Sequence, residues 1–389
     1  MQPSVVIVGG GVMGAATACF LARDHGAAVT VLEREPGYAR ASSALSASSI
    51  RQQFSTPVNI ALSQASLAFL RHATDELAVA GEAPPALGLV EAGYLYLVGD
   101  AGVAAQRELN AVQRNHGADV RLFDGDALRA RWPWLDTGGI ALGSWGAAGE
   151  GWFDGPALHA AFRRKARACG VRFATAEAVA FDTRHERVRA VLAADGARFE
   201  ADELVLTAGA WTAPLAARLG LPLPIAPKKR DVFVLESPAA LPGCPLLIDP
   251  SGVWMRPEGP LFLAGMPPRD GDPDEPPLDA IDHALFDDLI WPALAARIPA
   301  FEALRVRTAW AGYYEMNAFD HNGVVGALPG WANAHVAAGF SGHGMQHAPA
   351  VGRGLARWVA ERRWGAVDLT PLAPQRLTRG EPLRERNVI

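Results

Sequence analysis

The N-terminal glycine cluster has the spacing of a nucleotide-binding motif. Gly9, Gly11 and Gly14 directly follow a short apolar run, and Glu33 follows a second apolar run at 29–32. In such a motif one glycine permits a tight turn, one lets the backbone approach a pyrophosphate, and one lets a helix pack on a strand. The first N–H groups of the helix attract phosphates, and a carboxylate such as Glu33 accepts hydrogen bonds from a ribose diol. The pattern predicts a dinucleotide site and leaves NAD and FAD both open.

A second glycine-rich segment, residues 339–345, contains serine and histidine, residue types that act as nucleophiles in hydrolases and as ligands in metal enzymes. It is not a Gly-x-Ser-x-Gly nucleophile elbow, because His343 stands where the last glycine should be. His343 and His347 have the spacing of zinc ligands on a helix, but Gly344 replaces the glutamate that a zinc protease needs. We therefore predict no metal site.

The elements that must position these residues alternate between strand and helix. Residues 4–8, 12–25 and 29–32 are predicted to form a strand, a helix and a second strand, typical of a βαβ unit. Further strands are expected at 171–173, 179–183, 188–192, 203–207 and 335–338, and further helices at 158–169 and 348–362. The sequence also predicts a hairpin turn at Asp195-Gly196, a break at Pro222, Pro224 and Pro227, and a surface loop at 266–277.

This order of elements predicts an α/β fold, α+β overall, with a Rossmann-like nucleotide-binding domain. Because its strands lie at the start, middle and end of the chain, that domain is expected to be discontinuous, comprising 1–76, 150–222 and 308–389. The intervening segments, 77–149 and 223–307, are expected to form a second domain.

Composition narrows the class of protein. Half of the 389 residues are hydrophobic and 20% are charged, which argues against a disordered or membrane-spanning chain. The net charge of −5 does not favour nucleic acid. Three separated cysteines predict neither a disulfide framework nor a zinc knuckle. The uncharged run 5–22 is broken by glycines and preceded by no basic residue, so we expect no signal peptide and a cytoplasmic protein, with a peripheral position at the inner membrane left open.

Four segments together resemble one family. The N-terminal motif with Glu33-Arg34, Thr207-Ala208-Gly209-Ala210-Trp211, Trp310-Ala311-Gly312-Tyr313 and residues 339–344 are similar to the D-amino acid oxidase/sarcosine oxidase family of flavoproteins. The resemblance implies FAD, a second domain built on an antiparallel sheet, and oxidation of a C–N bond to an imine by hydride transfer to the flavin N5. Residues 51–55 and 313–326 resemble a flavoprotein associated with respiratory complex I assembly, whereas 33–35 and 227–230 resemble bacterial D-arginine and related D-amino acid dehydrogenases.

The resemblance also implies which residues hold the cofactor. The pyrophosphate and adenosine end would be held by the first glycine motif, Glu33 and Arg34, and the rest of the cofactor by a serine-rich loop, two strand ends and the second glycine-rich loop. Gly312 stands where some relatives carry a cysteine bonded to the flavin, so non-covalent FAD is expected. The implied cofactor residues are Gly9, Gly11, Val12, Met13, Gly14, Glu33, Arg34, Ser43, Ser46, Ala47, Ser48, Val179, Ala208, Gly209, Trp211, Gly312, Gly339, Phe340, Ser341, Gly342, His343, Gly344 and Met345.

On the substrate side the resemblance offers two arginines for a substrate carboxylate, which a guanidinium binds through two parallel hydrogen bonds. Arg51 matches the carboxylate-binding arginine of sarcosine oxidases, and Arg230 matches that of D-arginine dehydrogenases. A third family arginine, expected after Trp-Ala-Gly, is replaced by Tyr313 and Tyr314. These tyrosines and Trp254 are expected either to wall an apolar pocket that favours a neutral amine or simply to pack in the core.

Several alternatives stay open at this level. His343 is expected to shape the flavin loop or to polarise the pocket. The substrate is expected to be a small-molecule amine or amino acid, namely a D-amino acid, an N-methyl amino acid or an imino acid, and an uncommon or bulky amine is left open. The electron acceptor is O2 or a quinone or protein, and the absence of a lysine in 254–266 favours a dehydrogenase. A flavoprotein with mainly an assembly or binding role, and an NAD-dependent dehydrogenase, are the competing hypotheses.

Overall fold

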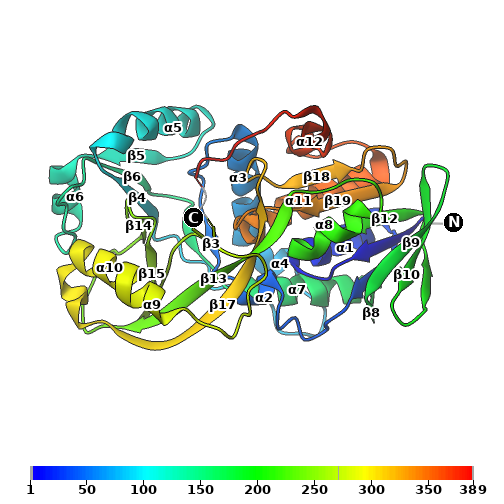
Figure 1. The fold of residues 1–389 in the computed structure, drawn as a ribbon, viewed down its shortest axis with the longest axis horizontal. Coiled ribbons are helices and arrows are strands. Elements are labelled where there is room, and N and C mark those ends of the chain that lie inside the picture. The colour runs from blue at the N-terminus through cyan, green and yellow to red at the C-terminus, as the bar shows by residue number, and fades with distance from the viewer. Residues whose placement is uncertain (1–2, 270, 388–389) are drawn as a thin grey trace.

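The computed structural model describes residues 3–269 and 271–387. Two large sheets lie side by side, and the C-terminal segment runs between them (Figure 1). The first sheet has six strands in the order β18-β19-β12-β1-β2-β8. All neighbouring strands in it are parallel except β18, which is antiparallel to β19. Its strands are β1 (Ser4–Val8), β2 (Ala28–Glu33), β8 (Arg172–Thr175), β12 (Glu203–Leu206), β18 (Val324–Ala327) and β19 (Ala334–Ala338).

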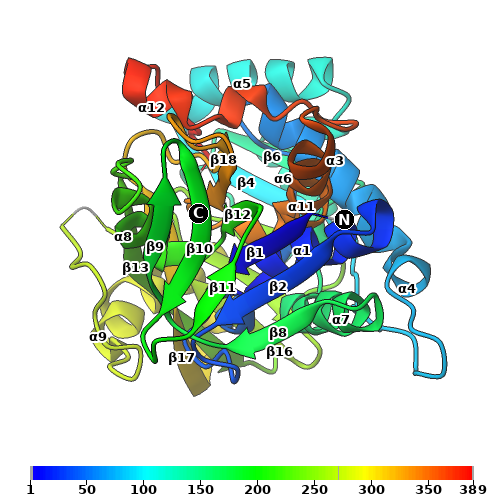
Figure 2. The same cartoon turned by 90° about the vertical axis from the view of Figure 1, so that its right-hand side faces the viewer.

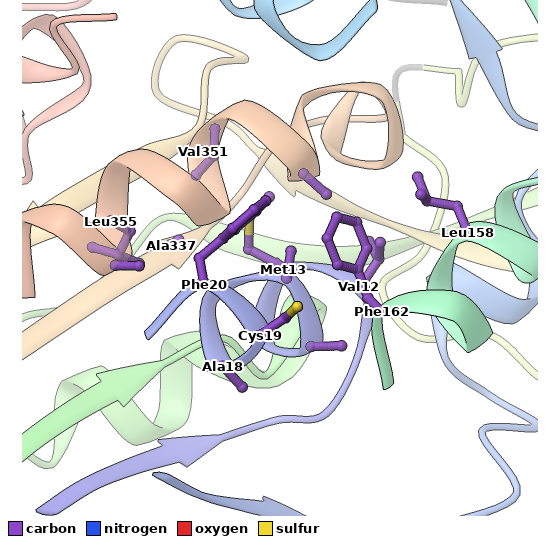
Figure 3. Close-up of a cluster of buried hydrophobic side chains, with 14 of the residues drawn as sticks. Val12, Met13, Ala18, Cys19, Phe20, Leu158, Phe162, Ala337, Val351 and Leu355 are labelled. Carbon is purple, nitrogen blue, oxygen red and sulfur yellow. The ribbon is translucent and has the colours of Figure 1, made fainter. Parts of the chain in front are cut away.

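Three long helices cover one face of this sheet: α1 (Val12–His25), α7 (Gly155–Ala168) and α11 (Gly344–Glu361). Figure 3 shows their apolar side chains meeting around Phe20 of α1, which contacts Phe162 of α7 edge to face with ring centroids 5.7 Å apart. Small residues let α1 and α11 approach closely, since a Cβ on Gly352 would lie 2.7 Å from the Cβ of Ala16. Residues 57–71 form α3 (Pro57–Arg71), which packs on the outer side of α11.

The second sheet has eight strands in the order β17-β13-β16-β15-β14-β4-β6-β5, and all neighbouring pairs are antiparallel except β14 with β4. Helices α5 (Val103–Asn115), α6 (Gly125–Arg131) and α10 (Trp291–Arg297) accompany it (Figure 1). Its strands are β4 (Tyr94–Val98), β5 (Val120–Phe123), β6 (Leu142–Gly146), β13 (Ile225–Glu236), β14 (Leu246–Ile248), β15 (Trp254–Glu258), β16 (Leu261–Gly265) and β17 (Arg305–Asn317).

A small antiparallel sheet of β9 (Ala178–Arg184), β10 (Arg187–Ala193) and β11 (Arg198–Glu200) projects beside the six-stranded sheet (Figure 2). The short elements are α2 (Ser42–Leu45), β3 (Ser49–Ile50), α4 (Ala73–Glu76), β7 (Gly151–Trp152), α8 (Thr212–Ala217), α9 (His283–Leu285) and α12 (Gln375–Arg379). The mixed fold with a parallel sheet and a largely antiparallel sheet is thus confirmed. We propose that the two large sheets are the cores of the two predicted domains.

Most predicted elements occur within two or three residues of their expected bounds, and two expectations need correction. The C-terminal helix begins at Gly344 and not at 348, because the glycine-rich loop turns into the helix directly. Pro227 is not part of a break but lies inside β13, opposite Glu315 of β17, with its carbonyl accepting a hydrogen bond from Glu275. In the described residues no helix is long and apolar enough to cross a membrane.

Two buried carboxylates hold the C-terminal segment against the body of the protein. Asp320 pairs with Arg376 at 2.7 Å and accepts the backbone N–H of Leu383 at 3.0 Å. Glu385 accepts hydrogen bonds from the backbone and hydroxyl groups of Ser55 and Thr56. The segment is therefore integrated into the structure beside the start of α3.

The Asp320→Ala variant is expected to lose about 3–5 kcal/mol of unfolding free energy, because the guanidinium of Arg376 is left buried without its partner. Chemical denaturation of the purified variant measures this loss. Asp126→Ala, which removes an exposed partner of Arg129, is the control and should change the unfolding free energy by about 0.5 kcal/mol or less. Equal effects in both variants would contradict the anchoring role.

Candidate functional site

A cavity of about 360 Å³ lies at the carboxyl ends of four strands of the six-stranded sheet. Gly9 follows β1, Glu33 ends β2, Ala208 follows β12 and Ala337 belongs to β19, and all four line the cavity. Strand β1 lies between β2 and β12, so the later strands of the sheet are added on both sides of it. Ligands of open α/β sheets bind at such a switch point, and the volume is within the usual range for ligand sites.

The three glycines of the first motif have distinct steric environments. Gly9 has φ +102°, and a Cβ there would lie 2.4 Å from the carbonyl oxygen of Thr207. A Cβ on Gly14 would lie 2.0 Å from the carbonyl oxygen of Gly9, so only glycine lets α1 pack on β1. A Cβ on Gly11 would meet only the Ser43 hydroxyl, at 3.2 Å. Gly11 therefore leaves the space toward the cavity open.

The start of α1 gives this end of the cavity its polarity. The Val12 N–H donates to the Ser43 hydroxyl at 2.8 Å, which ties the serine-rich loop to the helix N-terminus. Glu33 accepts the backbone N–H groups of Gly10 and Glu35, each at 2.9 Å. The positive end of the helix dipole faces the cavity and attracts phosphate, while the Glu33 carboxylate marks the position for a diol.

The structure brings most of the predicted cofactor residues to this cavity and leaves some outside its wall. Ser48 and Ser341 line a smaller neighbouring cavity. Gly14, Gly339, Phe340 and the His343 side chain line neither cavity. The predicted residues in the wall of the large cavity are Gly9, Gly11, Val12, Met13, Glu33, Arg34, Ser43, Ser46, Ala47, Val179, Ala208, Gly209, Trp211, Gly312, Gly342, Gly344 and Met345.

The other end of the cavity is formed by the eight-stranded sheet. Strands β13 and β17 pair so that Arg230 lies opposite Gly312, and Trp254 of β15 and Tyr314 of β17 complete the wall. The Arg230 guanidinium stacks on the Tyr314 ring, 4.4 Å from its centroid. Neither terminal nitrogen of Arg230 has a hydrogen-bond partner among the described residues, and both are closed to solvent. Burial lowers the pKa of Arg230 from its usual value.

The second candidate arginine, Arg51, points elsewhere. It lines the smaller cavity, of about 50 Å³, and one terminal nitrogen donates to the backbone carbonyl of Asn387 at 2.5 Å. Its backbone N–H donates to Gln346 at 2.9 Å. The C-terminal segment thus uses part of the hydrogen-bonding capacity that a substrate carboxylate would need.

The side chains of the two histidines lie behind the second glycine-rich loop. The ring of His343 packs against Phe54, with centroids 5.4 Å apart, and against His347 at 5.1 Å. Burial lowers the pKa of His343 well below its usual value and that of His347 to about 3. His343 is therefore not in position to polarise the cavity, because the fold turns its neutral ring into the core.

Sequence reasoning missed several residues of the cavity wall, among them Tyr38, Arg40, Ser42, Arg218 and Glu315. Glu315 accepts the Gly339 N–H at 3.0 Å, and burial raises the pKa of its carboxyl to about 7. It stands within a segment already noted for its family resemblance, three residues after Gly312. Tyr38 lines the cavity with its backbone in the left-handed region, at φ +57°.

The residues of the cavity fit FAD. Gly11 leaves room for a pyrophosphate beside the helix N-terminus, and Glu33 stands where a ribose would lie. The cavity then continues to Trp254 and Tyr314, so a long ligand can extend from the six-stranded sheet to the eight-stranded one. No cysteine is found in the part of the cavity wall that the structure describes.

Comparisons with known proteins agree with this geometry. Residues 4–358 match the model of the family DAO, described as FAD dependent oxidoreductase. An FAD-dependent oxidoreductase domain-containing protein 1 from Xenopus laevis is 40% identical over 425 residues, covering 100% of this chain and 85% of the relative. A glycine oxidase from Geobacillus kaustophilus is 28% identical over 378 residues, covering 95% of this chain and 96% of the relative. The crystal structure of L-proline dehydrogenase from P. horikoshii has a TM-score of 0.85 and 25% identity, covering 98% of this chain and 99% of that one.

The Gly14→Ala variant is expected to bind FAD about tenfold more weakly or worse, because the added methyl group forces α1 away from β1 and overpacking costs about 1–3 kcal/mol. Titration of the apoprotein with FAD, followed by flavin fluorescence, measures the affinity. Gly37→Ala is the matched control, since a Cβ at Gly37 meets no atom within 4 Å. Unchanged affinity in Gly14→Ala would contradict the placement of the cofactor.

Proposed function

The chain belongs to the DAO family of FAD-dependent oxidoreductases, and we propose that it binds FAD non-covalently in the large cavity and oxidises the C–N bond of an amine or amino acid to an imine. The substrate class is a D-amino acid, an N-methyl amino acid or an imino acid. Similarity to proteins named glycine oxidase and L-proline dehydrogenase supports amino acid chemistry.

The first half of the cavity would hold the adenosine and pyrophosphate of FAD. The start of α1 would face the phosphates, Glu33 the ribose, and Arg34 and Val179 the adenine. Gly312, Gly342 and Met345 would surround the flavin ring at the junction of the two sheets. When bound, FAD supplies the hydride acceptor for this chemistry.

The environment of Arg230 is the main support for an amino acid substrate. It is a buried guanidinium in the cavity wall whose terminal nitrogens lack hydrogen-bond partners in the described part of the chain. A buried charge without a partner is costly, and a carboxylate that accepts two hydrogen bonds from it relieves that cost. Because the Tyr314 ring covers the guanidinium, the carboxylate reaches it only when that ring moves.

The remaining wall would select the protonation state of the amine. Trp254 and Tyr314 present aromatic surface beside Arg230, and such a pocket disfavours an ammonium and favours the neutral amine. Tyr313 is held by a hydrogen bond from its hydroxyl to the Pro276 carbonyl at 2.6 Å, which fixes the ring in the cavity wall. A neutral amine is the form whose adjacent C–H bond can be oxidised.

The electron acceptor is proposed to be a quinone or a protein, with O2 as the alternative. The segment that carries a lysine in oxidases of this family, residues 254–266 here, has none. The missing lysine favours a dehydrogenase over an oxidase.

A second candidate function is a flavoprotein with mainly an assembly or binding role and little amine turnover. The contact between Arg51 and Asn387 favours it, because the arginine that matches the carboxylate site of sarcosine oxidases is bound to the chain's own C-terminal segment. Arg230 favours the enzyme, and turnover decides between the two.

The purified protein is expected to be yellow and to lose its flavin absorbance anaerobically with one class of compound from a panel of D-amino acids, N-methyl amino acids and imino acids. Visible spectra during titration measure this reduction, and readmitted air separates oxidase from dehydrogenase. FAD removed by mild denaturation confirms the non-covalent state. A yellow protein that no amine reduces would favour the binding role, and a protein that cannot take up FAD would refute the assignment.

The Arg230→Met variant is expected to lower kcat/KM for the amino acid about a hundredfold, since two charge-assisted hydrogen bonds together contribute about 3 kcal/mol. The effect should disappear with the corresponding amine that lacks the carboxylate. Arg307→Met, an exposed position on the neighbouring strand β17, is the control and should keep wild-type kinetics. An equal loss for both substrates would show that Arg230 has a purely structural role.

A further inference from the structure

Glu315 occupies the junction of the two sheets. It belongs to β17 of the eight-stranded sheet, yet its carboxylate accepts the Gly339 N–H at the end of β19 in the six-stranded sheet. Its other oxygen lies beside Gly344, since a Cβ there would be 3.3 Å away, and Gly344 begins α11. Glu315, Gly342 and Gly344 all line the large cavity. The carboxyl group therefore faces the space proposed for the flavin.

No charged side chain among the residues that the structure describes forms an ion pair with this carboxylate. The titratable groups on the elements that pack around Glu315 each contact other residues. Lys228 and Lys229 of β13 bind the loop carbonyls of Asp272 and Ala280, and Arg230 stacks on Tyr314. Asp320 pairs with Arg376, the Tyr313 hydroxyl donates to Pro276, and the rings of His343 and His347 face Phe54. None of these groups shares a hydrogen bond with Glu315 within the described residues.

The N-terminus of α11 supplies positive potential at this place. Gly344 and Met345, its first residues, line the cavity next to Glu315. A helix N-terminus stabilises negative charge, so it stabilises an ionised Glu315 and equally the negative charge that hydride uptake adds to a flavin ring. Two negative charges at one helix end repel each other.

We propose that Glu315 is the charge-compensating group of the cofactor site, ionised while the FAD is oxidised and protonated when it is reduced. Hydride transfer adds one negative charge to the cofactor, and the Glu315 carboxylate takes one proton from solvent, so that the site keeps its net charge. This inference rests on the FAD site proposed above and is independent of the identity of the amine.

Burial supports this role. Loss of solvation raises the pKa of Glu315 to about 7, while the hydrogen bonds from the Gly339 and Phe340 N–H groups act in the opposite direction. The carboxyl group thus titrates near neutrality, where a further negative charge in the cavity moves it to the protonated form.

The test is a potentiometric titration of the FAD-loaded protein with dithionite and redox mediators between pH 5.5 and 9, a range of about 3.5 pH units that includes neutrality. In wild type the midpoint potential should change by about 60 mV per pH unit from about pH 7 up to the higher pKa that Glu315 takes beside the reduced cofactor, because two protons accompany two electrons in that range. In Glu315→Gln it should change by about 30 mV per pH unit throughout, because one proton remains. The same slope in both proteins would overturn the proposal.

Glu150→Gln is the matched control. Glu150 is also buried with its pKa raised to about 7, but it binds Gln52 and Gln53 and lines neither cavity. The wild-type slope should persist in this variant, and its loss there would overturn the assignment to Glu315. Dithionite replaces the amine in this test, so failure to oxidise amines does not affect the outcome. A wild-type protein that binds no FAD would instead refute the proposed function and this inference with it.

A second measurement tests the proposal without the Glu315→Gln variant, in case that variant does not bind FAD. The infrared difference spectrum of the wild-type protein, reduced minus oxidised, should show the carbonyl band of a newly protonated carboxyl group. The band should remain in Glu150→Gln. Its absence in wild type would overturn the proposal.

Discussion

The absence of a side chain at Gly14 is the steric condition on which the site depends. Because Gly14 can approach the Gly9 carbonyl, α1 starts at the carboxyl end of β1 with its N-terminus at the cavity. The Gly9 backbone in turn contacts Thr207 after β12, so the ends of β1 and β12 and the start of α1 are locked together. The cavity lies at this point because further strands of the sheet lie on both sides of β1. Ser43 and Glu33 hydrogen-bond to backbone N–H groups at the start of α1 and so attach the neighbouring loops to the same helix end.

The pairing of β13 with β17 forms the other end of the cavity, which is proposed to bind the substrate. Both strands belong to the eight-stranded sheet and carry Arg230, Tyr314 and Glu315, and the Glu315 carboxylate accepts a hydrogen bond from Gly339 at the end of β19 in the six-stranded sheet. The site therefore combines a preformed polar cradle with a wall that contains Trp254, Tyr313 and Tyr314 beside a few charged side chains. The charges in that wall are few and buried, so each one has a large effect on the ligand it faces.

Burial away from water affects each candidate site residue differently. It leaves the terminal nitrogens of Arg230 without partners in the described structure, raises the pKa of Glu315, and keeps His343 and His347 neutral in the core. Arg51 is equally buried but is engaged by the C-terminal segment, which Asp320 and Glu385 hold in place. Proposals about substrate and cofactor chemistry accordingly concentrate on Arg230 and Glu315.

The sequence by itself determined the nucleotide motif, most helices and strands, the mixed fold and the family, because these features are encoded by contiguous residues with a regular spacing. It did not distinguish Arg51 from Arg230, it left open whether His343 shapes the flavin loop or polarises the pocket, and it overlooked Glu315. Those outcomes depend on which residues face each other across strands distant in sequence, such as Arg230 opposite Gly312, and on the C-terminal segment returning to Arg51. Only tertiary structure decides them, because side-chain direction and burial follow from strand register and packing and not from local pattern.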